Sequence, residues 1–104
     1  MNIFLFYHEK IFTTLKKLEK KKVIKIPKGF KGFTIELPPR NENAALSCNA
    51  ALVLSKHNNI PSIDLAKILR ENLLTVFKEF KTIEVAGPGF LNINFDKSFW
   101  KKHL

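Results

Sequence analysis

The chain has 104 residues, with 18 Lys and Arg against 9 Asp and Glu, and a formal net charge of +9. A chain of this length buries a single hydrophobic core, and its 45% apolar residues offset the conformational entropy lost on folding. The one cysteine, Cys48, excludes an intramolecular disulfide framework and a cysteine-based zinc site, and favours a reducing, cytoplasmic setting. The longest apolar run near the N-terminus, residues 3–7, is too short for a secretory signal or a membrane span.

The positive charge is concentrated in the first third of the chain. Residues 1–32 contain nine Lys and two Glu, which is +7 of the net +9. Such a concentration is typical of a surface that meets a polyanion, such as nucleic acid or an anionic membrane. A solvated, lysine-rich helix face is the alternative explanation. The lysines that we expect to attract an RNA backbone are Lys16, Lys17, Lys20, Lys21 and Lys22.

Apolar residues at spacings of three and four predict a first helix of about five turns, which Asn2 is able to cap. We expect its apolar stripe to pack onto the rest of the domain. In the alternative, the helix lies on an anionic membrane with its aromatic residues in the lipid. The stripe consists of Phe4, Tyr7, Ile11, Leu15 and Leu18.

A strand and two further helices are predicted next. Alternating apolar residues over 33–37 indicate a strand, and two prolines end it. A second helix is predicted from about Leu46 to His57, and the pair Asn58, Asn59 breaks it. Pro61 suits the first turn of a third helix, whose apolar spacing continues to Phe80.

Two strands are predicted at the end of the chain, Thr82–Ala86 and Phe90–Phe95. The Gly-Pro-Gly turn between them suits type II geometry, with Gly89 at positive φ. The order helix, strand, helix, helix, strand, strand predicts an α+β domain over residues 1–95, with helices packed on one face of a small, mainly antiparallel sheet. Residues 96–104 look like the start of a helix that links to a further part of a longer protein.

The sequence assembles no catalytic centre. His8, His57 and His103 stand far apart on separate predicted elements, without the spacing of metal ligands or of a nucleophile and its base. The turn at residues 87–89 lacks the Gly-Lys-Ser/Thr ending of a phosphate loop and precedes a strand. Cys48 stands among small residues and is expected in or near the core. We therefore expect neither a metal nor a cofactor in this segment.

The last strand carries the most informative side chains. Alternation places Phe90, Asn92 and Asn94 on one face and the apolar residues between them on the other. If the apolar set faces the core, an aromatic ring and two amides lie in the open. A ring stacks on an unpaired base, and an amide pairs with a base edge, which predicts recognition of a splayed-out nucleotide. In the alternative, Phe90 packs under the first helix and the amides lie on an edge strand.

Four stretches carry a family resemblance. They are Met-Asn-Ile-Phe at 1–4, Glu-Leu-Pro-Pro-Arg at 36–40, Asn-Ala-Ala-Leu-Val-Leu-Ser-Lys at 49–56 and Val-Ala-Gly-Pro-Gly-Phe-Leu-Asn at 85–92. The last stretch is the most specific. Together they resemble the N-terminal domain of arginine-tRNA ligases over essentially the whole chain.

This resemblance implies a domain that precedes a class I catalytic core, docks on the outer corner of a tRNA and reads a base of the D-loop. On this basis Phe90 would stack on the base and Asn92 would hydrogen-bond to it, with Asn94 on the same face. The chain lacks the class I activation motifs, so ATP with Mg, and arginine, would belong to the catalytic domain of the parent ligase. One departure is Asn43-Ala44-Ala45, where members typically have His-Gly-Asp.

Two functions are therefore compared below. The leading hypothesis is a tRNA-recognition domain without a catalytic site of its own and without a membrane partner. The alternative is a free-standing basic interaction domain that binds an anionic membrane or a protein partner through its first helix.

Overall fold

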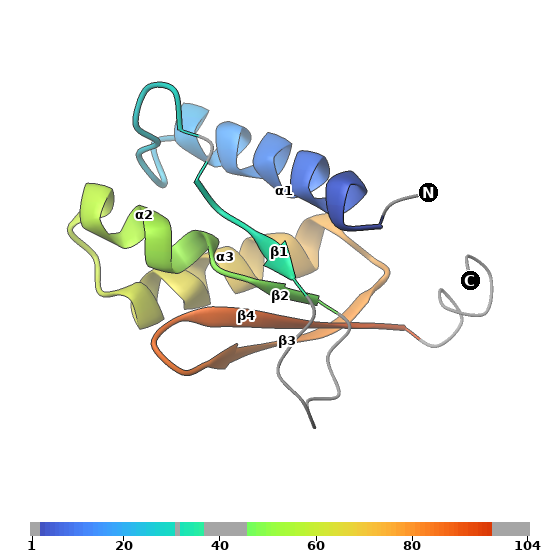
Figure 1. The fold of residues 1–104 in the computed structure, drawn as a ribbon. Coiled ribbons are helices and arrows are strands. Elements are labelled where there is room, and N and C mark those ends of the chain that lie inside the picture. Colours follow the sequence, from blue (N-terminus) through green and yellow to red (C-terminus); the bar gives the residue numbers. More distant parts are fainter. Residues whose placement is uncertain (1–2, 31, 37–45, 97–104) are drawn as a thin grey trace.

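The computed structural model describes residues 3–30, 32–36 and 46–96, which form three helices and a four-stranded sheet (Figure 1). The strands lie in the order β1-β2-β4-β3, and all neighbouring pairs are antiparallel. The predicted α+β class is confirmed. In chain order the elements are α1 (Ile3–Lys20), β1 (Ile35–Glu36), β2 (Leu46–Cys48), α2 (Ala50–Asn58), α3 (Ser62–Val76), β3 (Phe80–Ala86) and β4 (Phe90–Phe95).

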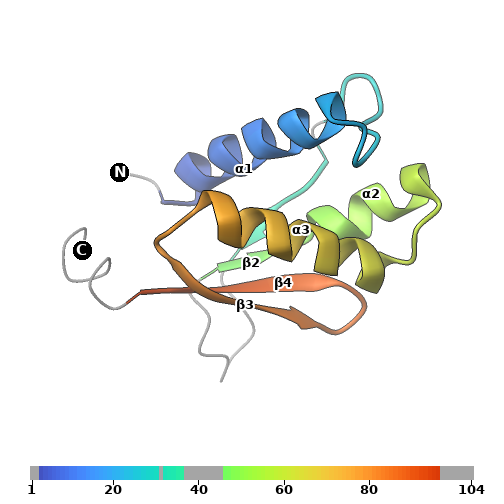
Figure 2. The same ribbon diagram turned by 180° about the vertical axis from the view of Figure 1, so that it is seen from behind.

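The helices cover one face of the sheet, as Figures 1 and 2 show from opposite sides. Helix α1 packs against β1, and α3 packs against β3 and β4. Among the described residues, no helix lies on the other face (Figure 1). The sheet therefore has one face that builds the core with the helices and one face on which no described helix lies.

The apolar stripe of α1 packs into this core, as predicted. Tyr7, Ile11 and Leu15 have no exposed surface, and Leu18 retains 5%. This burial disfavours the membrane-bound arrangement of the same stripe, because four of its five side chains are enclosed by protein and Phe4 is half-buried. No helix within the described ranges is long and apolar enough to cross a membrane. The predicted cap, Asn2, lies outside the described residues.

Helix α1 ends in a Schellman motif that directs the chain into the lysine-rich loop. The N–H of Lys22 donates to the carbonyl of Glu19, and that of Val23 to the carbonyl of Leu18. Lys22 takes a φ of 64°, in the left-handed conformation that such a motif requires and that glycine usually fills. The loop consequently turns back alongside the last turns of α1.

The structure differs from the sequence prediction at the start of the second helix. Leu46 fits the helical spacing, but it belongs to β2, and α2 begins at Ala50. Strand β2 pairs with β1 on one side and with β4 on the other. The prediction of a helix here was wrong. The pairing partner, β4, lies more than forty residues away in the sequence, so the spacing of neighbouring residues does not indicate the pairing.

Other boundaries shift by a few residues. The strand predicted over 33–37 appears as Ile35–Glu36, with Phe33 buried just before it. The apolar spacing attributed to α3 runs on to Phe80, but that residue begins β3. The residues that replace the family's usual triplet, 43–45, and the helix predicted after Asp96 lie outside the described residues.

Candidate functional site

The hairpin between β3 and β4 sets the position of the candidate site. Its turn is closed by the N–H of Gly89 donating to the carbonyl of Ala86 at 3.2 Å. The predicted type II turn, with Pro88 second and Gly89 third, would span residues 87–90, so the observed turn lies one residue earlier. Gly89 has the expected positive φ, +139°, and Gly87 also has one, +54°. The Ser62 hydroxyl at the start of α3 donates to the Pro88 carbonyl. The turn is therefore anchored to α3 immediately before Phe90.

Phe90 lies on the uncovered face of the sheet with 38% of its surface exposed. The alternative in which it packs under α1 is therefore wrong. Asn94 is half-buried, and its Nδ2 donates to Thr82 Oγ1 across the strand pair at 3.0 Å. Exposure thus leaves Phe90 as the ring that a ligand can reach directly.

Asn92 is buried, with only 3% of its surface exposed, so the expectation that all three side chains lie in the open was wrong for this residue. Its place in the sheet contributes to this burial. Strand β4 is an interior strand rather than an edge, and Asn92 is flanked in register by Ser47 of β2 and Glu84 of β3. Neither neighbour was visible as part of the site from local sequence.

The side-chain oxygen of Asn92, Oδ1, is buried and has no hydrogen-bond partner. A buried acceptor without a donor costs about 1–3 kcal/mol, because its interaction with water has been lost and not replaced. Such atoms are rare in folded proteins, and a bound water, an ion or a functional role accounts for them. Asn92 therefore combines the burial of a core residue with the unmet acceptor of a binding residue.

Two residues of this face were missed by the sequence analysis. Ser47 is 8% exposed and pairs in register with both Asn92 and Glu36, and Glu84 is exposed on the other side of Asn92. The alternation Leu-Ser-Cys at 46–48 was the available signal, since it is the pattern of a strand with one buried face. Three residues are too few for that pattern to outweigh the helical spacing around them.

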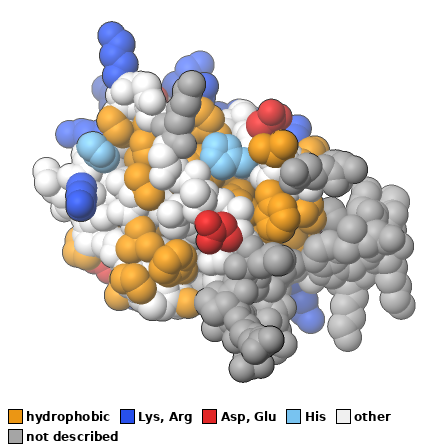
Figure 3. All heavy atoms as spheres, in the orientation of Figure 1, with side chains coloured by type: hydrophobic (Ala, Val, Ile, Leu, Met, Phe, Trp, Pro, Cys, Tyr) orange, Lys and Arg blue, Asp and Glu red, His pale blue; other side chains and the backbone are white. Residues whose placement is uncertain are grey.

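The lysines predicted to attract a polyanion lie at the end of α1 and in the turn after it. All five are exposed. Lys and Arg side chains line the upper and left margins of the surface in Figure 3, over this end of the molecule. Within the described residues the single ion pair joins Arg70 and Glu71 at 3.2 Å, so the cluster is not neutralised there. The cluster comprises Lys16, Lys17, Lys20, Lys21 and Lys22.

The remaining candidate side chains have structural roles. The His8 ring stacks on Phe33 with 4.1 Å between centroids, and its Nε2 donates to the Phe33 carbonyl at 3.0 Å. His57 is exposed at the end of α2, and His103 lies outside the described residues. Cys48 is buried in the core, and desolvation raises the pKa of its thiol to about 11. No group of three His, Cys, Asp or Glu suited to a metal occurs in the described part of the chain.

Fold and surface together define a small, basic α+β domain with an exposed aromatic ring and a buried, unpaired amide oxygen on the sheet face away from the helices. Residues 7–95 match the family model of the arginyl tRNA synthetase N terminal domain. The chain belongs to this family.

Similar proteins are arginine-tRNA ligases of bacteria. That of Pelagibacter ubique (strain HTCC1062) is 38% identical over 104 residues, which is 100% of this chain and 18% of the relative. That of Wolbachia pipientis wMel is 32% identical over 100 residues, 96% of this chain and 17% of the relative. The chain thus spans less than a fifth of the length of these curated relatives.

Proposed function

We propose that this chain is the tRNA-recognition part of an arginine-tRNA ligase. It docks on the outer corner of the tRNA and reads a D-loop base, so that the complete ligase attaches arginine to its tRNA in an ATP-dependent reaction. The observation that carries the proposal is the exposed ring of Phe90 beside the buried, unpartnered Oδ1 of Asn92. Membership of the family and the names of the similar proteins support the choice of tRNA as partner.

Phe90 supplies a stacking surface for a base that is already unpaired. An aromatic side chain on a sheet face is a common device of RNA-binding domains, and each stacked base contributes about 1–3 kcal/mol. The anchoring of the hairpin turn on Ser62 keeps the ring in place before binding. Stacking accepts any base, so Phe90 contributes affinity more than selectivity.

Asn92 supplies the selectivity. Its Oδ1 accepts a hydrogen bond from a donor on the base edge, and a base without that donor leaves the acceptor unpaired at a cost. Because Oδ1 is buried in the free chain, the amide has to move toward the ligand as the base stacks on Phe90. No hydrogen bond of Oδ1 is broken in that movement, which keeps its cost low. Asn94, held by Thr82, lies beside it on the same face.

The catalytic step belongs to the rest of the complete ligase in this proposal. The relatives extend far beyond the part that matches this chain. We place ATP with its magnesium, arginine and the class I activation chemistry on that remainder. We propose the cytoplasm as the location, where tRNAs are charged.

The proposal is tested by Phe90→Ala and Asn92→Ala in the complete ligase. Each substitution is expected to weaken binding of arginine tRNA by about 1–3 kcal/mol, the range for a lost stacked base or a lost base-edge contact. Phe6→Ala is the matched control, since Phe6 is 37% exposed on α1, away from the sheet face. The measurements are the Kd and the steady-state constants for tRNA.

A tRNA that lacks the D-loop base sharpens this test. If Phe90 stacks on that base, removing both the ring and the base costs no more than removing either one. Tight and equal tRNA binding by the wild type and both variants would contradict the proposal. So would additive losses for the ring and the base.

A further inference from the structure

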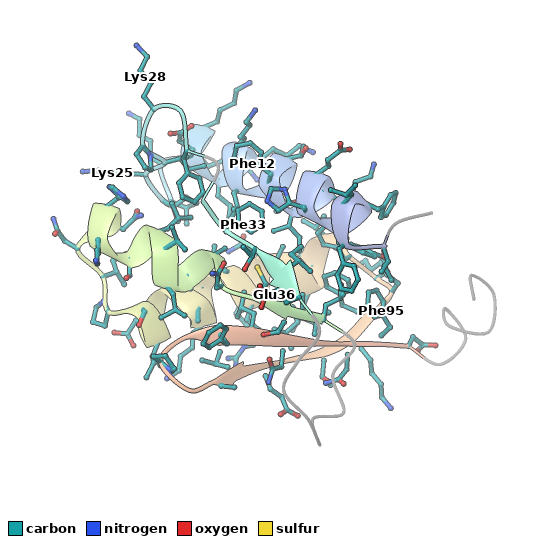
Figure 4. All side chains as sticks on the ribbon, in the orientation of Figure 1. Phe12, Lys25, Lys28, Phe33, Glu36 and Phe95 are labelled. Carbon is teal, nitrogen blue, oxygen red and sulfur yellow. The ribbon has the colours of Figure 1, made fainter. Side chains whose placement is uncertain are left out.

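A groove of about 570 Å³ lies between the end of α1 and the loop that follows it. Half-buried Phe12, Ile26 and Phe30 give it an apolar lining, and exposed Lys16, Lys20 and Lys28 stand around it. We call it the lysine groove. Figure 4 shows Phe12 on α1 beside Phe33 and Lys28 extending outward from the tip of the loop. The groove lies on the helical side of the molecule, distinct from the sheet face that carries Phe90.

The loop that forms one wall is built in advance of any ligand. A turn at its tip is closed by the N–H of Phe30 donating to the Pro27 carbonyl at 3.0 Å, with Gly29 at a φ of +75°. The Asn58 side chain holds the loop from α2, accepting from the Lys25 N–H at 2.6 Å and donating to the Lys25 carbonyl at 3.0 Å. Ordering this wall on binding therefore costs little free energy.

The electrostatics of the groove favour an anion. Three lysines border it, and Glu19 is the single acidic residue among the described residues that line it. The Glu19 carboxylate faces the loop backbone, where Oε2 accepts from the Ile26 N–H at 3.2 Å. Lys16 Nζ lies 4.6 Å from the centre of the Phe12 ring. Within the described residues none of the three lysines has a carboxylate partner, so their ammonium groups are available to a ligand.

We propose that the lysine groove is a second RNA contact, which takes an unpaired nucleotide of the bound RNA. Its phosphate lies between the lysines, and its base or ribose packs on the aromatic lining. This inference rests on the proposed function, because it assumes that RNA is the partner. Aromatic rings interleaved with cationic side chains are the recurring means of holding single-stranded nucleic acid.

The location of the groove suits one RNA that reaches both sites. In Figures 1 and 2 the loop after α1 and the hairpin turn before Phe90 lie at the same end of the molecule. The longest dimension of the chain is 39 Å, so both sites lie within the reach of a folded RNA. A lipid surface fits less well, since interfacial binding needs an exposed apolar helix face and that of α1 is buried.

The test removes the positive charge of the groove while keeping polar side chains there, with Lys16, Lys20 and Lys28 all changed to Gln in the complete ligase. The matched control changes Lys10, Lys67 and Lys78 to Gln, three exposed lysines outside the groove, with the same loss of charge. We expect the groove variant to bind arginine tRNA at least tenfold more weakly at 0.15 M salt. The slope of log K against log salt is expected to become shallower by roughly 0.7–0.9, the change for one lost phosphate contact. The control variant is expected to change the affinity for arginine tRNA and its salt dependence much less.

Phe30→Leu tests the apolar lining separately, because it keeps a large apolar side chain and removes the ring. We expect a several-fold weaker Kd with an unchanged salt slope. A measurement on the unmodified protein accompanies the variants: acetylation of lysines read by mass spectrometry, with and without the tRNA. We expect the tRNA to protect Lys16, Lys20 and Lys28 and to leave Lys67 and Lys78 reactive.

Each outcome decides between the two proposals. If the groove and control variants bind alike and Lys28 stays reactive, the groove inference is wrong, and a loss with Phe90→Ala still supports the proposed function. If Phe90→Ala has no effect but the groove variant does, RNA binding resides in the groove and base reading on the sheet face is wrong. Binding to phosphatidylserine vesicles that requires the groove lysines, together with unchanged tRNA binding, would overturn the groove inference in favour of a lipid surface.

Discussion

Tyr7 ties α1 to the far end of the chain. Its hydroxyl donates to Glu79 Oε2 at 2.8 Å, and its ring lies within 6.0 Å of the rings of Phe77, Phe80 and Phe95. The side chain has no exposed surface. Desolvation by this burial, together with the hydrogen bond to Glu79 and the negative charge of that carboxylate, raises the pKa of the Tyr7 phenol well above its ordinary value.

The raised pKa predicts a loss of stability in alkali. Below pH 10 the phenol is neutral in both states. Above it the unfolded state releases the proton and the folded state does not, so the free energy of unfolding falls as pH rises, by up to about 1.4 kcal/mol per pH unit. The Tyr7→Phe variant is expected to have a free energy of unfolding about 1 kcal/mol lower at pH 7, because the hydrogen bond is missing. Between about pH 10 and 12 its free energy of unfolding is expected to fall less steeply than that of the wild type.

Urea unfolding at several pH values checks this prediction. Cys48 also titrates in this range, but it is common to both proteins, so the difference between the two curves isolates Tyr7. This chain has one tyrosine, which makes the comparison clean. Parallel curves for wild type and Tyr7→Phe would contradict the role assigned to the phenol.

At the scale of elements, the contact between the β3–β4 turn and the start of α3 decides where Phe90 stands. Gly89 adopts a φ of +139°, and a Cβ built there would lie 3.1 Å from both the Cβ and the carbonyl oxygen of Ser62. The glycine is thus required twice, by the backbone conformation and by the closeness of α3. This explains in physical terms why the motif at 85–92 needs a glycine directly before the aromatic residue.

Gly89→Ala is therefore expected to destabilise the chain by about 2–4 kcal/mol, the sum of backbone strain and displacement of α3. Gly29→Ala is the matched control, since Gly29 also has a positive φ, +75°, but nothing lies within 4 Å of its added Cβ. It should cost only about 1–2 kcal/mol of strain. Equal losses for the two variants in urea unfolding would show that the contact with Ser62 is unimportant.

Over the whole molecule, positive charge and the candidate base-reading face lie on different layers. The lysine cluster belongs to α1 and the loop after it, on the helical side, whereas Phe90 and Asn92 lie on the open face of the sheet. Coulombic attraction acts over about 10 Å at moderate salt and does not distinguish bases. In the proposed function, attraction and discrimination are therefore separable properties of the molecule.

This separation predicts the behaviour of Lys17, Lys21 and Lys22, the cluster members that do not line the lysine groove. Changing all three to Gln is expected to weaken binding of every RNA tested and to flatten its salt dependence. The preference for arginine tRNA over the same tRNA with another D-loop base is expected to stay the same. Affinities for both tRNAs at three salt concentrations provide the measurement, and a changed preference would contradict the separation.

The spacing of apolar residues was sufficient to predict the long helices and strands that bury one face. The α1 stripe and the strands around the Gly-Pro-Gly turn follow from spacing alone, because a helix or strand that must bury an apolar face repeats with its own period. The same alternation correctly put Phe90 and Asn94 on the face away from the core. The family resemblance rested on four short stretches of the sequence, of which 85–92 spans the Gly-Pro-Gly turn, and it is confirmed.

The sequence by itself determined the fold class, the basic first third and the side of β4 that carries Phe90 and Asn92. Only the tertiary structure decided that Leu46–Cys48 is a strand, that β4 is an interior strand, and that Asn92 is therefore buried with its oxygen unpaired. It also brought Phe12, Phe30 and Lys28 together around one groove. The physical reason is that periodicity reports which face of an element is apolar, whereas burial of a polar side chain depends on neighbours that are distant in the chain.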